Sequence, residues 1–462
     1  MEKIKQFFSY DRSLTSFTDA NGKKTTLLSL MIPILIQSVL TNTMNTVNTY
    51  ILSAYSESAA AATATATQLV NMISLFYSLV SVGVNIVVVQ YVGAQKMKTA
   101  GDAASLSISF CGGASLVIGI LMSIFAKECM IMMGLTGTLL EEATEYFRIV
   151  AMFNIFSTLI TVLANITRAY GRPDIGLYCG FLMNALNAIF NYIVIFRPFE
   201  TPLYGITGVA VSRTIAEAIA LAVNVALMGK IGIQFSFKAA FAPKLEMFKL
   251  ILKYGIPSSV VSLSWSISQL ISTMIMAKVG ETALIAKSFV NSFLNYATIL
   301  SASMGSATSF MVGWYVGKNE MDKAYRLNLQ ILKIAVLINI AISIGFIAFT
   351  DVLMSPLTQN EEILEISRKV VFINLFVAVG KAINNVEDNA LRSAGDVVYQ
   401  LVVGLSSCWI VAVLFCYIFG VVFGWGLVGC WLSFALDELG RGFAYLIRWL
   451  SKKWMTKRAV RD

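Results

Sequence analysis

Long apolar stretches alternate with short polar stretches along the whole chain. A helix of about 20 apolar residues crosses the hydrocarbon core of a bilayer. We find twelve stretches of this kind, at 26–52, 59–92, 102–125, 142–168, 175–196, 205–229, 252–277, 283–316, 327–350, 366–390, 397–421 and 425–449. The pattern predicts twelve transmembrane helices, so we expect an all-α fold that is integral to a membrane.

Basic residues gather in every second polar stretch. Lysine and arginine are found in the N-terminal segment, in the loops after the even-numbered helices and in the C-terminal tail, as at Lys96, Lys98 and Lys318. The loop after the ninth helix is acidic instead, with Glu361 and Glu362. Basic loops remain on the cytoplasmic side of a membrane. We therefore expect a multi-pass protein of the cell inner (plasma) membrane with both termini in the cytoplasm.

Composition supports a bilayer as the solvent. Hydrophobic residues make up 57% of the 462 residues and charged residues 13%, whereas a soluble protein has roughly 25% charged residues. The first 25 residues lack the apolar core of a signal peptide. The formal net charge of +9 follows from the basic loops and does not indicate nucleic acid. Histidine is absent, which removes the commonest metal ligand, and we expect no metal site and no cofactor.

Short motifs recur at a fixed distance. Ile32-Pro33 recurs as Ile256-Pro257 (257 − 33 = 224), and the Tyr91-Val-Gly motif recurs at Tyr315 with the same offset (315 − 91 = 224). Near the end of each half the offset becomes 221, as between Gly205 and Gly426 (426 − 205 = 221). The chain is thus predicted to be two pseudo-symmetric six-helix lobes. Because six is even, both lobes insert in the same orientation, as a parallel repeat. The predicted parts are a cytoplasmic segment 1–25, an N-lobe 26–229, a cytoplasmic linker 230–251, a C-lobe 252–450 and a cytoplasmic tail 451–462.

Polar residues lie within several apolar stretches of the N-lobe. Such groups are costly in hydrocarbon, so they normally face the bundle interior or a wet cavity. Asparagines spaced by three or four residues lie on one helix face. The candidate substrate or cation cavity of this lobe contains Asn45, Asn48, Asn184, Asn187, Asn191, Ser212 and Glu217. The alternative is that these amides only join helices by hydrogen bonds.

Ionisable residues are the candidates in the C-lobe, namely Lys287, Lys381, Glu387, Asp388, Asp437 and Glu438. Glu438 is the repeat counterpart of Glu217 (438 − 217 = 221). We expect the two lysines to pair with carboxylates of this lobe. In the alternative interpretation each acid neutralises an arginine nearby on its own helix, as the spacing of Asp437 and Arg441 allows.

Enzyme signatures are absent from the sequence. It contains no Walker A motif, no dinucleotide-binding glycine motif and no nucleophile elbow. We therefore expect a protein that is not an enzyme and that does not itself use ATP. An integral membrane enzyme is disfavoured because histidine and catalytic clusters are absent. A channel is disfavoured because a duplicated, two-lobed bundle suits alternating access better than a continuous pore.

The order and duplication of these motifs resemble the multidrug and toxic compound extrusion (MATE) family, within the multidrug, oligosaccharidyl-lipid and polysaccharide flippase superfamily. The resemblance covers residues 25–455 and rests on five kinds of motif, namely Ile32-Pro33 and Gly255-Ile-Pro257, Val92-Gly93 and Val316-Gly317, Thr167–Gly171, Leu391–Asp396 and Gly205–Gly208. It implies a monomeric antiporter that exports small cationic or amphiphilic compounds in exchange for protons or sodium ions, through a cavity between two lobes.

The sequence departs from the family at the cation site. Asn48 and Asn191 stand where many members have aspartate, Ser212 stands where a threonine is common, and Trp265 falls near the place of a helix-7 glutamate. Asparagine cannot titrate and gives a cation no net charge. We therefore expect ion coupling to have moved to Glu217 or to the acids of the C-lobe. A lipid-linked saccharide or lipid flippase and an uncoupled facilitator remain as alternatives.

Overall fold

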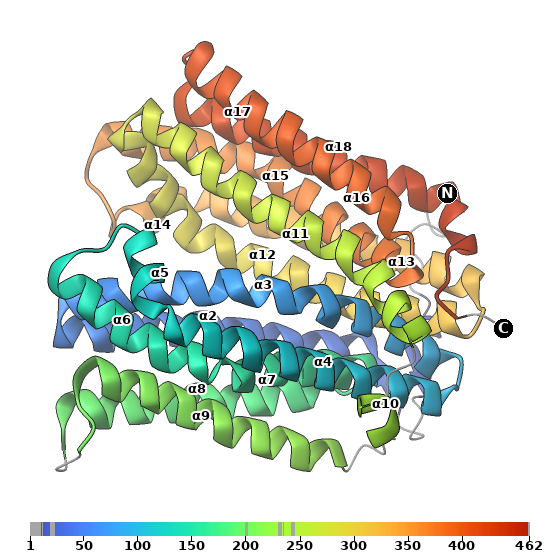
Figure 1. Ribbon diagram of the computed structural model, residues 1–462. Helices are drawn as coiled ribbons and strands as arrows, with labels where there is room; N and C mark the ends of the chain where they lie inside the picture. The colour runs from blue at the N-terminus through green and yellow to red at the C-terminus, as the bar shows by residue number, and fades with distance from the viewer. Residues whose placement is uncertain are drawn as a thin grey trace. The chain divides into compact units, whose positions relative to one another are not determined.

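Helices make up nearly all of the structure, a computed structural model that describes residues 11, 13–18, 24–198, 202–229, 233, 235–241 and 245–460 (Figure 1). The helices up to residue 241 are α2 Leu27–Tyr55, α3 Glu57–Gly93, α4 Met97–Ile124, α5 Ala126–Met132, α6 Gly137–Met152, α7 Asn154–Ala169, α8 Pro173–Phe196, α9 Gly205–Met228 and α10 Phe237–Phe241. Those that follow are α11 Leu245–Val279, α12 Glu281–Gly317, α13 Met321–Ala348, α14 Thr350–Met354, α15 Glu361–Ala394, α16 Val397–Ser406, α17 Phe415–Tyr417 and α18 Gly426–Leu450.

Two compact units make up the chain. The N-terminal unit consists of Ile32–Val92 and Lys96–Ile256. The C-terminal unit consists of Pro257–Asp462, Gly93–Gln95 and Met1–Met31, as far as these residues are described. The helix α11 contributes to both units, because the boundary falls just before Pro257. The domain bounds predicted from the repeat stay a prediction.

Each of the twelve predicted ranges overlaps a helix. Within the described residues, eight helices are long and apolar enough to cross a membrane, or nine if a bent pair counts as one span. That pair corrects the predicted continuous helix 142–168, because α6 and α7 meet at Phe153 with a bend of 51°. The predicted helix 397–421 also departs from a regular α-helix, because it contains the π-helical segments η2 Ser407–Leu414 and η3 Ile418–Val422. The full count of twelve spans stays a prediction.

A short hairpin precedes the first long helix. Its strands β1 Ser16–Thr18 and β2 Lys24–Thr26 pair antiparallel, with Phe17 opposite Thr25. The sequence analysis predicted no strand, so this hairpin is a small departure from an all-helical fold.

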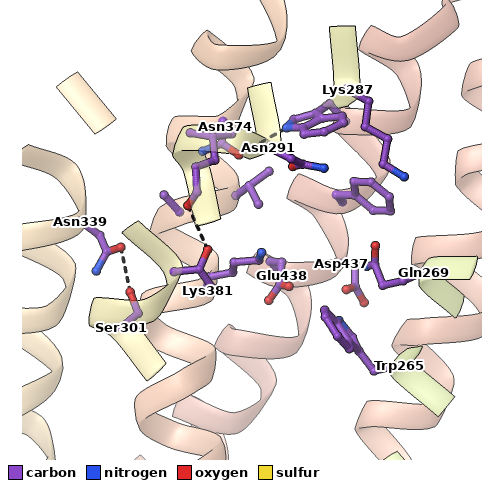
Figure 2. Close-up of a pocket in the computed structure, with 16 residues that line it drawn as sticks. Trp265, Gln269, Lys287, Asn291, Ser301, Asn339, Asn374, Lys381, Asp437 and Glu438 are labelled. Atoms are coloured by element: carbon purple, nitrogen blue, oxygen red, sulfur yellow. Dashed lines mark hydrogen bonds between the residues drawn. The ribbon is translucent and has the colours of Figure 1, made fainter. Parts of the chain in front are cut away.

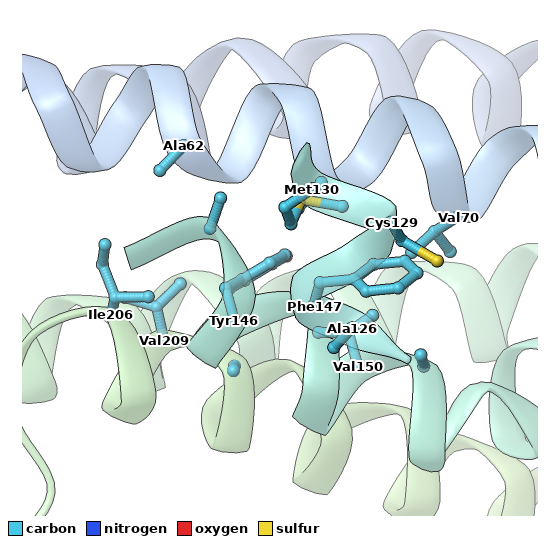
Figure 3. Close-up of a cluster of buried hydrophobic side chains, with 14 of the residues drawn as sticks. Ala62, Val70, Ala126, Cys129, Met130, Tyr146, Phe147, Val150, Ile206 and Val209 are labelled. Atoms are coloured by element: carbon cyan, nitrogen blue, oxygen red, sulfur yellow. The ribbon is translucent and has the colours of Figure 1, made fainter. Parts of the chain in front are cut away.

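The core of the N-terminal unit joins the helices that carry its polar residues. Buried apolar side chains from α3, α5, α6 and α9 meet around Phe147 and Met130, neither of which is exposed (Figure 3). On α3, Ala59, Ala62 and Ala66 have no exposed surface, so the alanine-rich start of this helix is closely packed. Small side chains allow neighbouring helix backbones to approach closely.

The helix α15 organises the C-terminal unit, where it packs against α12, α13 and α18. It begins at Asn360, whose side chain accepts hydrogen bonds from the backbone N–H groups of Glu362 (2.9 Å) and Ile363 (3.4 Å). It ends at Gly395, whose φ of 94° is readily adopted by glycine. At mid-helix Gly380 meets the backbone of α18 directly. A Cβ atom at Gly380 would lie 2.7 Å from the carbonyl carbon of Glu438.

Candidate functional site

Three asparagine side chains meet in the N-terminal unit. The Nδ2 of Asn48, on α2, donates to Asn187 Oδ1 on α8 at 2.9 Å. The Nδ2 of Asn191 donates to Asn48 Oδ1 at 3.2 Å and to Asn187 Oδ1 at 3.3 Å. Asn191 is almost fully buried, and its Oδ1 atom has no hydrogen-bond partner among the described residues. The structure thus brings together three of the amides that were predicted to line one cavity.

The remaining candidates of the N-terminal unit lie outside this cluster of amides. Asn184 is satisfied by its own helix, because its Nδ2 donates to the Gly180 carbonyl at 2.8 Å. Ser212 is buried on α9. The side chain of Asn45 lies outside the described residues.

Glu217, on α9, is held by a neighbour on the same helix. The Nε of Arg213 donates to Glu217 Oε1 at 3.0 Å, and the Nη1 of Arg213 donates to the hydroxyl oxygen of Tyr146 at 3.3 Å. Tyr146 belongs to the buried core around Phe147 (Figure 3). The core therefore fixes the arginine, and the arginine neutralises the carboxylate. Glu217 therefore pairs with an arginine on its own helix, as the alternative interpretation of the buried acids describes.

A cavity of about 150 Å³ lies inside the C-terminal unit (Figure 2). Its walls come from α11, α12, α13, α15 and α18. Three groups of side chains line it: aromatic rings, amides and hydroxyls, and charged groups. The aromatic residues are Trp265, Trp431 and Phe434, the amides include Gln269, Asn291, Asn339 and Asn374, and the charged residues are Lys287, Lys381, Asp437 and Glu438.

Two acids on α18 share one arginine beside this cavity. The Nη2 atom of Arg441 lies 2.9 Å from Asp437 Oδ2 and 3.2 Å from Glu438 Oε2. The hydroxyl of Ser407, at the start of the π-helical segment η2, donates to Asp437 Oδ1 at 2.5 Å. Asn384 on α15 donates to Glu438 Oε2 at 2.8 Å. Both carboxylates are buried and well supplied with donors, as buried charges require.

The lysines of the cavity do not pair as the sequence analysis expected. Lys287 donates to the hydroxyl of Thr273 at 2.5 Å and forms no ion pair with a described carboxylate. Lys381 interacts electrostatically with Asp437 without forming a direct ion pair. The physical reason is that Arg441 already forms ion pairs with both acids of α18, Asp437 and Glu438.

Glu387 and Asp388 lie outside the cavity. The Asp388 carboxylate is bound by Arg392 on the same helix and by the amide of Gln400. Glu387 has no exposed surface, and its Oε1 accepts a hydrogen bond from Asn328 Nδ2 at 2.9 Å. Its Oε2 has no partner among the described residues. Of the six C-lobe candidates, the cavity therefore unites Lys287, Lys381, Asp437 and Glu438, and leaves these two apart.

The amides of the cavity were not predicted as site residues. Gln269 lies four residues after Trp265, and Asn291 lies four residues after Lys287. This spacing places each pair on one helix face, so the signal was present on α11 and α12. Asn384 lies three residues after Lys381, so the same signal was present on α15, but its contact with Glu438 depends on how α15 crosses α18.

A second cavity lies inside the N-terminal unit, and its volume is about 90 Å³. Three of its lining residues are repeat counterparts of residues that line the first cavity. Ser74 corresponds to Thr298 (298 − 224 = 74), Tyr77 to Ser301 (301 − 224 = 77) and Ser157 to Lys381 (381 − 224 = 157). The two cavities thus occupy equivalent places in the two halves, but the described residues that line the second cavity are all uncharged.

Comparison with known proteins identifies the family. The MatE family model matches residues 33–193 and again residues 257–418, so the two matches begin 224 residues apart (257 − 33 = 224). The chain belongs to the MATE family of transporters. The two MATE matches have the same offset as the repeated motifs. The protein is therefore a multi-pass membrane protein of a transporter family.

Two MATE relatives span nearly the whole chain. YisQ of Bacillus subtilis (strain 168), an uncharacterized transporter, is 30% identical over 96% of this chain and 98% of its own length. A probable multidrug resistance protein NorM from Thermotoga maritima is 22% identical over 94% of this chain and 93% of its own.

Solved structures share the MATE fold. A transporter of the MOP superfamily from Pyrococcus furiosus has a TM-score of 0.83 at 19% identity and covers 94% of this chain and 96% of its own. The outward-facing conformation of a multidrug resistance MATE family transporter has a TM-score of 0.80 at 20% identity, and covers 92% of this chain and 96% of its own. At these identities the likeness shows the fold alone.

Proposed function

We propose that this protein is a secondary active efflux transporter that exports small organic amphiphiles by alternating access. The observation that carries the proposal is the cavity in the C-terminal unit, whose aromatic rings, amides and charged groups suit a ligand with an apolar body and a polar head. Family membership and the names of relatives such as NorM support export of drug-like compounds. The proposed location is the inner (plasma) membrane, with both termini in the cytoplasm and the protein acting as a monomer.

Coupling to protons or sodium ions is the second part of the proposal. The amide cluster of Asn48, Asn187 and Asn191 contributes no net charge. The buried carboxylates of Glu217 and Glu438 are the candidates for coupling, since they occupy equivalent repeat positions and each is bound by an arginine. A proton or cation that binds such an acid competes with its arginine, and this competition would link ion binding to a rearrangement of the helix.

Transport into proteoliposomes tests both parts. A fluorescent organic dye is offered while a proton gradient or a sodium gradient is imposed separately. We expect accumulation that depends on one of the two gradients and that decreases in the Glu217→Gln or the Glu438→Gln variant. Wild-type accumulation in both variants would refute these acids as the coupling groups. Dye movement that ignores both gradients would favour the alternatives, an uncoupled facilitator or a lipid or lipid-linked saccharide flippase.

A further inference from the structure

The charges around the C-terminal cavity do not balance. Asp437 and Glu438 supply two negative charges, whereas Arg441, Lys381 and Lys287 supply three positive charges. Arg441 is in contact with both acids, and Lys381 interacts electrostatically with Asp437. Among the described residues, Lys287 is therefore the positive charge without a carboxylate. A half-buried ammonium without an anion is costly, unless a ligand supplies that anion.

Lys287 is well placed to meet a ligand. It enters the cavity from α12, one helical turn before the amide of Asn291 (Figure 2). The described partner of its ammonium is the hydroxyl of Thr273, which is neutral and leaves two N–H donors. The other titratable groups that act on it are the thiols of Cys416 and Cys430. The ammonium can thus accept an incoming anion without giving up an ion pair.

The rest of the lining suits an anionic head group on an apolar body. Asn374 uses its Oδ1 to accept from Trp431 Nε1 at 3.3 Å, and its amino group has no acceptor among the described residues, so it can donate to a ligand. Asn291 and Gln269 add further amide donors, and Trp265 adds an aromatic wall. Pockets for whole drug-sized ligands hold roughly 300–1,000 Å³. A cavity of about 150 Å³ is smaller than this and close to the size that holds one benzene ring, so it suits the head-group end of a ligand and not the whole molecule.

The positive charge is specific to this half of the chain. The repeat counterpart of Lys381 is Ser157, and that of Lys287 is Thr63 (287 − 224 = 63). Ser157 lines the cavity of the N-terminal unit, which has no charged residue in its described lining. The fold that the two halves share therefore does not require the two lysines.

We propose that the cavity of the C-terminal unit binds the anionic head group of an organic amphiphile, such as a carboxylate or sulfonate, with Lys287 as its charge partner and Lys381 as a second cation. This assignment rests on the proposed function and narrows its substrate class from cationic or general amphiphiles to organic anions.

A binding assay on the purified full-length protein tests the assignment. Two dyes of similar ring structure and opposite charge, carboxyfluorescein and rhodamine 6G, are titrated in detergent and followed by fluorescence anisotropy. We expect saturable binding of carboxyfluorescein, and a Kd about tenfold weaker in Lys287→Gln, the equivalent of 1.4 kcal/mol for one lost charge contact. Lys278→Gln, at an exposed position on α11 outside the cavity, is the matched control and should bind like the wild type.

Charge-conserving and second-site variants keep the test decisive. Lys287→Arg should retain anion binding, and Lys381→Gln should weaken it independently, even if Lys287→Gln fails to fold. Absence of saturable carboxyfluorescein binding, or an unchanged Kd in both glutamine variants, overturns the proposal. Because binding is measured without any gradient, an anion that binds but is not transported would refute the proposed function alone. Gradient-driven transport of rhodamine 6G without anion binding would refute only this assignment.

Discussion

Gly380 is the position where one added methyl group should disturb the site most. Its helix, α15, crosses α18 so closely that a Cβ atom would lie 2.7 Å from both the Glu438 carbonyl carbon and the Leu439 amide nitrogen. Ordinary contacts begin at 3.4 Å, so the helices would have to separate by about 0.7 Å (3.4 − 2.7 = 0.7). The atoms in the way are backbone atoms, which cannot rotate aside. Overpacking of this kind costs about 1–3 kcal/mol.

The matched control is Gly440 on α18, where a Cβ atom would meet nothing within 4 Å. Replacing a helical glycine with alanine in open space stabilises a helix by up to about 1 kcal/mol. We therefore expect Gly380→Ala to lower the melting temperature in detergent and Gly440→Ala to leave it equal or higher. Size-exclusion chromatography of heated samples, detected by fluorescence, measures both.

The same substitution should also weaken ligand binding. Lys381 directly follows Gly380, and Glu438 is the residue across the crossing, so separation of the helices moves two cavity residues apart. If Gly380→Ala were as stable as Gly440→Ala and bound dye equally well, the close crossing would not hold the cavity together, and the argument would be wrong.

Three further predictions concern buried polar and aromatic contacts, each measured as a change in thermal unfolding. Glu387→Gln should keep the stability of the wild type, because glutamine preserves the acceptor for Asn328 and is neutral at a buried site that has no counter-ion among the described residues, whereas Asn328→Leu should cost about 1–3 kcal/mol by removing the hydrogen bond to Glu387; equal losses in the two variants would contradict this. Arg441→Gln should cost about 3–5 kcal/mol, since it leaves two buried carboxylates uncompensated, and an unchanged melting curve would count against the ion pairs. Trp454→Ala should cost about 3–5 kcal/mol, because the Trp454 side chain is almost fully buried and its ring stacks on that of Trp449 with the ring centroids 4.0 Å apart. A loss below about 1 kcal/mol would show that this stacking contributes little.

Helix positions could be predicted from the sequence because the apolar runs are long and the loops between them are polar. The bend between α6 and α7 could not, since Ala151–Asn154 contains neither proline nor glycine and looks like an ordinary apolar run. The π-helical turns from Ser407 onward are equally invisible, because the sequence there is uniformly apolar and a helix with wider turns needs no special residue. Local composition fixes that a helix forms but not how it deviates from regular geometry.

The site was predictable where its contacts lie within one helix. The pairs Arg213–Glu217, Asp388–Arg392 and Asp437–Arg441 follow directly from a spacing of four residues. Contacts between helices were predicted less well. The expected pairing of Lys287 with a carboxylate was wrong for the described residues, since counting charges along the chain does not reveal that one arginine binds two acids.

The two halves have kept the place of a cavity and changed its charge. In the N-terminal unit Ser157 lines the cavity, the nearby amide cluster is neutral, and Arg213 balances Glu217. In the C-terminal unit Lys381 replaces the serine and the cavity carries one surplus positive charge. A bound ion or charged substrate can shift an ion pair of the protein only in a cavity that has charged side chains. An anion that binds Lys287 and Lys381 would draw Lys381 away from Asp437. Arg441 would then be the one cation left beside Asp437 and Glu438 among the described residues. The charge of the substrate and the proposed coupling acid Glu438 would therefore lie in the same cavity. A variant that removes Lys381 should alter both the anion affinity and the gradient dependence of transport.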